Sequence, residues 1–315
     1  RLNNMSHSFL KESKLYIVYG GNKYRIYTNT ALNFSQSFAE DSYPVKTLHD
    51  QTKMVEGTTI TKANPAQFSF EVPLTVEKDE SIVVDLLSDL VSSSVAEIDT
   101  QQLKAFDSYI QTGSATFKVA NCVITSSTFS FNPSEQVKVE VSGEGTKLTR
   151  VGNESYTIPG ELQSETSTRT PLIVYPVVSI DSLSMNSIIS TTLQIQTDIT
   201  WRPFETLQSS LAVTNSSNAM FPSAYTIKNR VISGAIIQYQ TDNNITQFDD
   251  FSTNSSITIK AVQVGKPSSD NGYFQINMNP SMYTARMSVD EIYTQTYDYR
   301  STDNTALGTR ITQYS

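Results

Sequence analysis

The sequence is poor in the residues on which most metal and catalytic sites depend. Its 315 residues include one cysteine, Cys122, and two histidines, His7 and His49. A single cysteine excludes an internal disulfide, and Cys122 lies in the strand-like run KVANCVITSS, where we expect a small buried hydrophobic residue. The histidines are far apart and outside any metal-ligand spacing. The sequence therefore predicts no metal site and no cofactor.

Motifs for phosphate binding and nucleophilic catalysis are also absent from the sequence. No P-loop, dinucleotide fingerprint or G-x-S-x-G elbow occurs. Gly143-Glu144-Gly145 follows a strand-like run but opens no helix pattern, so a turn is expected there. Adjacent Glu40 and Asp41 are expected to form a solvated acidic patch rather than an acid/base pair. An enzyme is not predicted.

Two further absences concern partners. No apolar run approaches the roughly 20 residues of a membrane helix, and no signal peptide is recognisable, so no membrane partner is predicted. The chain has no run of basic residues, and its formal net charge is −8. Because affinity for nucleic acid comes mostly from cations placed on phosphates, tight binding to DNA is not expected.

What the sequence does contain is typical of a β-rich structural protein. Charged residues make up only 17%, and Ser, Thr, Asn and Gln take their place beside 16 Tyr and 14 Phe. Alternating runs predict strands through most of the chain. Among them, residues 58–75 are expected to form a hairpin that turns at Asn64-Pro65.

Three short segments have a helical period instead. In DESIVVDLLSDLV, residues 79–91, apolar side chains recur every three or four positions, which predicts an amphipathic helix. A second short helix is expected over Gln101–Ile110. A third is expected over residues 204–211, FETLQSSL, where Pro203 suits a first turn.

The chain divides into two similar halves. We expect a first domain over residues 1–150, a polar linker over 151–170 and a second domain over 171–315. The two halves share the order hairpin, helix, strands, and SATFKVANCVITSS from Ser114 aligns with SAYTIKNRVISGA from Ser223. The fold class predicted is mainly β, with two tandem β-sandwich or barrel domains, each flanked by a short helix.

One long polar segment stands out in the first half. Residues 37–57, SFAEDSYPVKTLHDQTKMVEG, have no clean helix or strand period, and such long connections are usually functional or disordered. The segment has apolar residues to bury, and Pro44 favours an extended path, which suits an arm that orders on a partner. No counterpart is expected in the second half. The candidate contact residues are Phe38, Glu40, Asp41, Tyr43, Pro44, Leu48 and Met54.

Two stretches of the first half resemble the tail tube proteins of long-tailed bacteriophages. They are YRIYTNTALNFSQSFAEDSYPVKTLHDQTKMVEGTTITKANPAQFSFEVPLTVEKDESIVVDLLSD and VITSSTFSFNPSEQVKVEVSGEGTKL. The resemblance is firmest over residues 15–150 and only architectural over 171–300. It implies a structural virion protein that assembles with itself into stacked rings, the conduit for DNA ejection.

The resemblance also implies an assembly and its neighbours. Six domains normally form a ring, so two fused domains favour a trimer with pseudo-sixfold symmetry over a hexamer, and the arm of residues 37–57 would reach the adjacent ring. Sheath, tape measure and baseplate proteins are implied partners, and DNA passes without tight binding. The protein would be located in the virion tail, and in the host cytoplasm during assembly. Candidate lumen-facing carboxylates are Glu71, Glu140 and Asp198, for which a solvated outer face is an equal alternative.

Other interpretations stay open at this point. A tube initiator, a terminator or a distal-tail ring would share the fold and differ in whether rings stack. A β-sandwich adhesin or fibre module would bind glycans as a monomer, although the aromatic residues here lie mainly within strands. A carbohydrate-active enzyme would need a carboxylate pair, and none can be nominated.

Overall fold

The structure of the protein is a computed structural model that describes most of the chain. The described residues are 13–28, 32–44, 55–88, 90–92, 101–163, 165–166, 168–181, 183–201, 221–222, 224–247, 249–270, 272–289, 291–302 and 311–313. The predicted helix over residues 204–211 lies outside them. Among the described residues strands dominate, which confirms the mainly-β prediction.

The first half contains twelve of these strands and one α-helix. In chain order they are β1 (Lys14–Tyr19), β2 (Asn22–Ile26), β3 (Asn33–Ser35), β4 (Phe38–Pro44), β5 (Val55–Ala63), β6 (Ala66–Pro73), α1 (Ser81–Ser88), β7 (Leu90–Ser92), β8 (Gln101–Leu103), β9 (Phe106–Gln111), β10 (Thr116–Phe131), β11 (Lys138–Gly145) and β12 (Lys147–Gly152).

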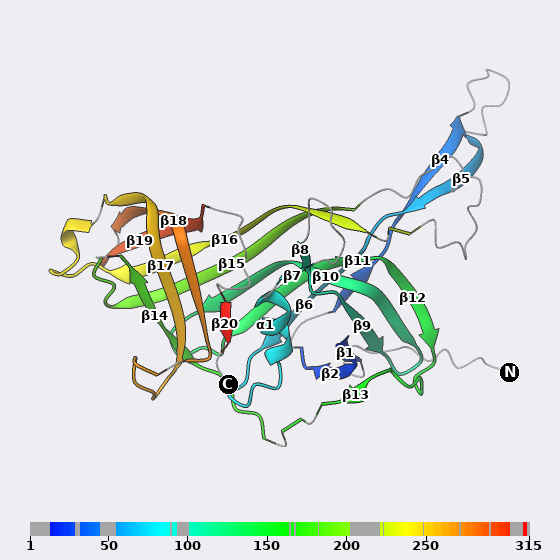
Figure 1. The fold of residues 1–315 in the computed structure, drawn as a ribbon, viewed down its shortest axis with the longest axis horizontal. Coiled ribbons are helices and arrows are strands. Elements are labelled where there is room, and N and C mark those ends of the chain that lie inside the picture. The colour runs from blue at the N-terminus through cyan, green and yellow to red at the C-terminus, as the bar shows by residue number, and fades with distance from the viewer. Residues whose placement is uncertain are drawn as a thin grey trace.

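The remaining elements form the second half, preceded by one short strand. They are β13 (Glu161–Leu162), β14 (Val174–Ile180), β15 (Ile188–Trp201), β16 (Tyr225–Tyr239), the 3-10 helix η3 (Ile245–Gln247), β17 (Phe251–Gln263), β18 (Phe274–Val289), β19 (Tyr293–Ser301) and β20 (Ile311–Gln313). Sixteen of the described strands join in one sheet, and β15 and β16 are long strands that cross the molecule in Figure 1.

The two halves of this sheet repeat one strand order. In the first half the hydrogen-bonded order is β1-β9-β10-β11-β6-β3, and in the second half it is β14-β17-β18-β19-β16-β15. Every one of these neighbours is antiparallel. Matched in chain order, β1, β3, β6, β9, β10 and β11 correspond to β14, β15, β16, β17, β18 and β19.

This correspondence corrects the alignment made from sequence. That alignment paired Ser114 onward, now β10, with Ser223 onward, now β16, whereas the strand order matches β10 with β18 and β6 with β16. Strands of similar composition resemble one another locally, and only the pairing order tells them apart. In the place that α1 takes in the first half, between β6 and β9, the second half has η3 between β16 and β17.

The two halves are joined by direct strand pairing. The last part of β10 pairs with β15, from Ser126 opposite Gln196 to Phe131 opposite Thr191. Phe129 and Phe131 lie there against Phe274, with ring centroids 5.1 and 5.9 Å apart. One cluster of buried hydrophobic residues runs through both halves. The division into two domains therefore stays a prediction, because sheet and core continue across it.

The hairpin predicted over residues 58–75 is wrong in its pairing, although its strands exist. β5 and β6 run on in one direction, and they pair with β4 and β3 respectively: Phe38 lies opposite Ala63, and Phe34 lies opposite Phe68. Asn64 donates its backbone N–H to the Ser37 carbonyl at 2.9 Å, so the ladder continues past Pro65. The four strands are one long two-stranded ribbon with an irregularity in the middle.

The helical predictions have a mixed outcome. The first is confirmed by α1, which is shorter than expected and buries Ile82, Val83 and Leu86 in the core. The second is wrong, because Gln101–Ile110 forms β8 and most of β9. Phe106 and Ser108 are buried, and β9 lies between β1 and β10 in the sheet. Phe106 and Ile110 recur at a helical spacing, but a short apolar run fits either period.

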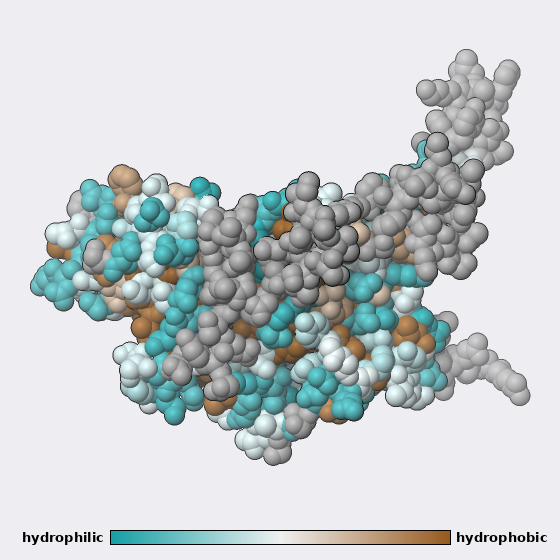
Figure 2. Space-filling model, viewed as in Figure 1, coloured by the Kyte–Doolittle hydropathy of each residue, from teal (hydrophilic) through white to brown (hydrophobic). Residues whose placement is uncertain are grey.

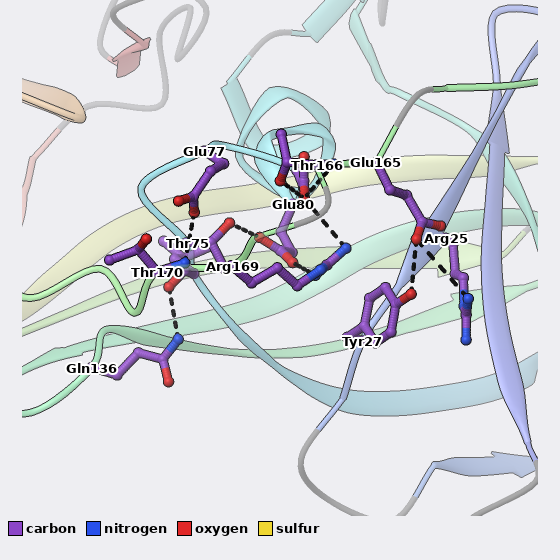
Figure 3. A network of polar contacts seen from close by, with 12 residues as sticks. Arg25, Tyr27, Thr75, Glu77, Glu80, Gln136, Glu165, Thr166, Arg169 and Thr170 are labelled. Atoms are coloured by element: carbon purple, nitrogen blue, oxygen red, sulfur yellow. Dashed lines mark hydrogen bonds and ion pairs between the residues drawn. The ribbon is translucent and has the colours of Figure 1, made fainter.

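The segment expected as a linker is fastened to the first half. β13 pairs in parallel with β2, and Arg169, further along the chain, lies beside the start of α1 (Figure 3). Arg169 forms an ion pair with Glu80 there and stacks over the ring of Tyr27 at 3.7 Å. Leu172 then donates its backbone N–H to the Leu74 carbonyl at 3.0 Å. The chain thus enters the second half from a fixed position.

Candidate functional surfaces

One face of the long sheet is polar, and register places its residues. Directly opposite residues of paired strands share a face, and successive residues alternate between faces. The buried face carries Phe70, Val141 and Ser127 in one row across β6, β11 and β10. The other face therefore carries the intervening side chains, which are Ser69 and Glu71 of β6, Glu140 and Ser142 of β11, and Ser126 and Thr128 of β10.

All three predicted carboxylates lie on this polar face. Glu71 is directly opposite Glu140, and Glu140 is opposite Thr128. Thr128 is in turn opposite Gln194 of β15, and Asp198 lies four residues further along the same strand. The alternation in the sequence places these residues on strands, and the register brings them to one surface. Whether that surface faces a lumen stays a prediction.

Charge on the polar face is sparse and partly neutralised. Lys138 Nζ lies 3.4 Å from Glu71 Oε1, and the Glu71 side chain is 15% exposed. Around this pair the surface forms a hollow of about 280 Å³, lined by residues such as Ser69, Thr128 and Glu140. Because the lining is mostly hydroxyl and carboxylate oxygen, the hollow offers little to attract phosphate.

The polar face continues into the second half through residues for which the sequence carries no functional prediction. Gln194 is opposite Ser233, and Ser233 is opposite Arg300 of β19. Two positions before Arg300, Asp298 forms an ion pair with Arg286 of β18 at 2.9 Å. In TYDYRS the tyrosines are buried, Asp298 lies between them and Arg300 follows the second, and this alternation is the signal that could have found the two charged residues.

The predicted arm is a two-stranded ribbon over its described part. β4 and β5 project away from the body at the upper right of Figure 1. Glu40 and Asp41 are exposed, and Phe38 is 48% exposed. Leu48 and Met54 lie outside the described residues, as do the side chains of Tyr43 and Pro44, although the backbone of both belongs to β4.

The base of the arm packs against the second half. The Phe38 ring lies edge-on to Phe221 at 6.5 Å, and Lys147 Nζ lies 4.4 Å above the Phe221 ring. Ala63 and Phe221 are both buried in a small cluster of their own. Phe221 belongs to the connection between β15 and β16, so the end of that hairpin meets the base of the arm.

A counterpart of the arm exists in the second half, contrary to the sequence expectation. The ribbon of β3–β4 with β5–β6 corresponds to the hairpin of β15 with β16, whose pairing runs from Ile188 opposite Gln238 to Trp201 opposite Tyr225. In both halves the hairpin extends beyond the part that pairs with the rest of the sheet. Composition hid this likeness, because the first extension is an irregular polar stretch and the second is a regular strand pair.

Cys122 is fully buried, and burial raises the pKa of its thiol far above the usual range. Within the part of the chain that the structure describes, no group of three metal-ligating side chains occurs. No described helix is long and apolar enough to cross a membrane. What the surfaces do offer is sheet edges, a polar wall and a projecting ribbon.

These features define a mainly β protein with open sheet edges, a polar sheet face and a projecting ribbon. The model of the bacteriophage baseplate tube protein family matches residues 5–309, and the chain therefore belongs to that family. A search of curated proteins found no significant match. Membership in this structural family confirms the bacteriophage tube class expected from sequence, and it implies a location in the virion tail.

Proposed function

We propose that three copies of the chain close into a ring that forms one layer of the tube within the baseplate. The repeated strand order is the observation that carries this proposal. Two like units in one continuous sheet give six units from three chains, so a closed ring would have pseudo-sixfold symmetry. Closure would also remove the open sheet edges, which are otherwise an aggregation hazard.

The polar face is proposed as the wall of the channel. Its small hydroxyl and amide side chains, with Glu71, Glu140 and Asp198 among them, would present passing DNA with few cations. A wall of this kind avoids the affinity that a basic channel gains by releasing counterions from phosphates. The opposite face carries the hydrophobic core and α1, so it is covered within the chain.

The arm is proposed as the contact with an adjacent layer. The β4–β5 ribbon projects from the body and exposes Glu40, Asp41 and Phe38. Family membership favours a layer near the baseplate over the repeated tube of the whole tail. The adjacent layer would then include a different baseplate or tube protein, and the ring acts as an initiating layer, one of the alternatives raised from sequence.

Electron microscopy and native mass spectrometry of the purified chain test the proposal. The expected particle is a ring with a mass three times the 35.0 kDa of one chain, stacked to no more than one or two layers. Long regular tubes would assign the protein to the repeated tail tube instead. A monomer that binds glycans at every concentration tested would refute the ring and favour an adhesin.

The channel wall has a separate test in assembled virions. Asp198→Lys places a cation on the polar face, and we expect slower DNA ejection together with measurable DNA retention by isolated rings. Glu161→Lys is the matched control, because Glu161 is an exposed carboxylate on β13, far from that face in the sheet order. Equal behaviour of the two variants would show that the polar face does not line the channel.

A further inference from the structure

The internal join between the halves shows how one repeat unit receives the next. β10 has two parts: as far as Cys122 it pairs with β9, and from Ser126 it pairs with β15 along the same edge. β15 is the strand at the end of the second unit. The last part of β10 is therefore an edge that the following unit completes.

The corresponding strand β18 has no such completion. β17 pairs with β18 only as far as Phe251 opposite Thr284, and the Ala285 N–H donates to the Asp250 carbonyl just beyond. From Arg286 to Val289, β18 pairs with β19 on one side. Among the described residues, no strand pairs with its other side.

Side chains near the end of β10 are more buried than those near the end of β18, as the missing neighbour of β18 predicts. Phe129 and Phe131, near the end of β10, are each 2% exposed. Met287 and Val289, near the end of β18, lie on the same face as buried Tyr283 yet are 42% and 62% exposed. The second half covers Phe129 and Phe131, whereas no described residue covers Met287 and Val289 in the same way.

The uncovered end of β18 belongs to a wider apolar surface. Ile292, just before β19, and Tyr293, its first residue, are 58% and 52% exposed. With Met287 and Ile245 they line a hollow of about 620 Å³. In Figure 2 this end of the molecule, on the left, carries a few hydrophobic residues among mostly hydrophilic ones. Exposed apolar patches of this kind mark interaction sites.

The repeat also identifies the occupant. β15, which covers β10, corresponds to β3, because β15 pairs with β16 as β3 pairs with β6. β3 pairs with β6 on one side, and no described strand pairs with its other side. A second copy of the chain therefore offers, at the start of its first half, the strand that the open end of β18 lacks.

We infer that the edge Arg286–Val289, with the apolar surface beside it, receives β3 of a second copy, so that the contact between chains repeats the join of β10 with β15. The inference rests on the proposed ring and assigns its interface. Such a contact is head-to-tail, and it closes only when the rotation between units divides a full turn. Main-chain pairing gives the affinity, as in strand addition to an open sheet edge.

Cross-linking between two variants that each carry one added cysteine tests the contact. Met287→Cys protein is mixed with Ser35→Cys protein and treated with a short bis-maleimide. The native Cys122 is fully buried, and unmodified chain is the blank. We expect linked dimers from the mixture and none from either variant alone, because a head-to-tail contact does not bring two copies of the same residue together. Val264→Cys mixed with Ser35→Cys should give none.

A charge at the same edge gives a second measurement. Val289→Asp should weaken association at least about tenfold, whereas Val264→Asp, on a valine of similar 55% exposure, should leave it unchanged. Three-chain rings that form without the Met287–Ser35 cross-link and tolerate Val289→Asp would overturn the inferred interface and leave the proposed function standing. A chain that stays monomeric would overturn both.

Discussion

Arg169 fastens the connection between the two halves, and its removal should be costly. Its guanidinium forms an ion pair with Glu80 and a second with Asp79 at 3.4 Å (Figure 3). The Glu80 side chain is 1% exposed, and besides Arg169 it accepts a hydrogen bond from the Thr75 hydroxyl at 2.6 Å. In Arg169→Met the buried Glu80 carboxylate would lose its cation and keep only the Thr75 hydroxyl as a hydrogen-bond donor.

The expected loss follows from that geometry. Breaking a buried ion pair by removing one partner costs about 3–5 kcal/mol, because the other charge is left uncompensated. The Arg169 side chain is 24% exposed, so we take the lower end, and its cation–π contact with Tyr27 adds about 0.5 kcal/mol. We therefore expect Arg169→Met to lower the free energy of unfolding by roughly 3 kcal/mol.

Urea unfolding of monomeric chain measures this loss, and the structure supplies a matched control. Arg25 also lies over the Tyr27 ring, at 4.5 Å, but its ion pair with Glu165 spans 4.0 Å and both side chains are about 30% exposed. Arg25→Met should therefore cost less than about 1 kcal/mol. Replacing Glu80 by Gln in the Arg169→Met background should recover part of the loss. Equal losses from the two arginine variants would refute the reasoning.

Three further predictions concern stability and the arm. Gly234→Ala should lose roughly 2 kcal/mol of stability in a thermal melt, because its Cβ would lie 2.0 Å from the Thr192 carbonyl, whereas Gly57→Ala, with open space around it, should be neutral. Burial raises the pKa of Tyr225 to about 12, above its unfolded value near 10. The neutral phenol therefore stabilises the folded state below pH 10, and this contribution is lost as the pH rises to 12. The Tyr225→Phe variant should lose less stability than the unchanged chain in an alkaline titration. Replacing residues 40–61 by an Asn-Gly turn should leave the free energy of unfolding in urea unchanged. The same variant should lose contact with the adjacent layer in micrographs. A lower free energy of unfolding would contradict this prediction.

Strand positions could be predicted from the sequence far better than strand partners. Alternation identified β6, β10 and β11 because one face of each is buried. The prediction of a turn at Asn64-Pro65 was wrong, because a residue pair typical of turns also fits an irregularity inside a continuous ribbon. That distinction depends on whether Asn64 finds a partner across the ribbon, here the Ser37 carbonyl. Pairing is a long-range property that local composition does not encode.

The candidate surfaces were predictable in part for the same reason. Glu71, Glu140 and Asp198 were chosen because each alternates with apolar neighbours, and that alternation suffices to place a residue on a solvent-facing side of a strand. Their convergence on one face needs the register between strands. The open edge of β18 had no sequence signal at all, since Met287 and Val289 resemble any buried strand residues until the missing neighbour is noticed.

The two hairpin extensions also bear on how layers would stack. A duplicated unit with one arm each would project six separate arms from a ring of three chains. Here the connection between β15 and β16 brings Phe221 against Phe38 and Lys147 at the base of the first arm, and Ala63 completes that cluster. The second extension thus supports the first instead of projecting alone. A trimeric ring would then present three composite arms, so a threefold contact with the adjacent layer follows from the fold even where the ring wall has six like units.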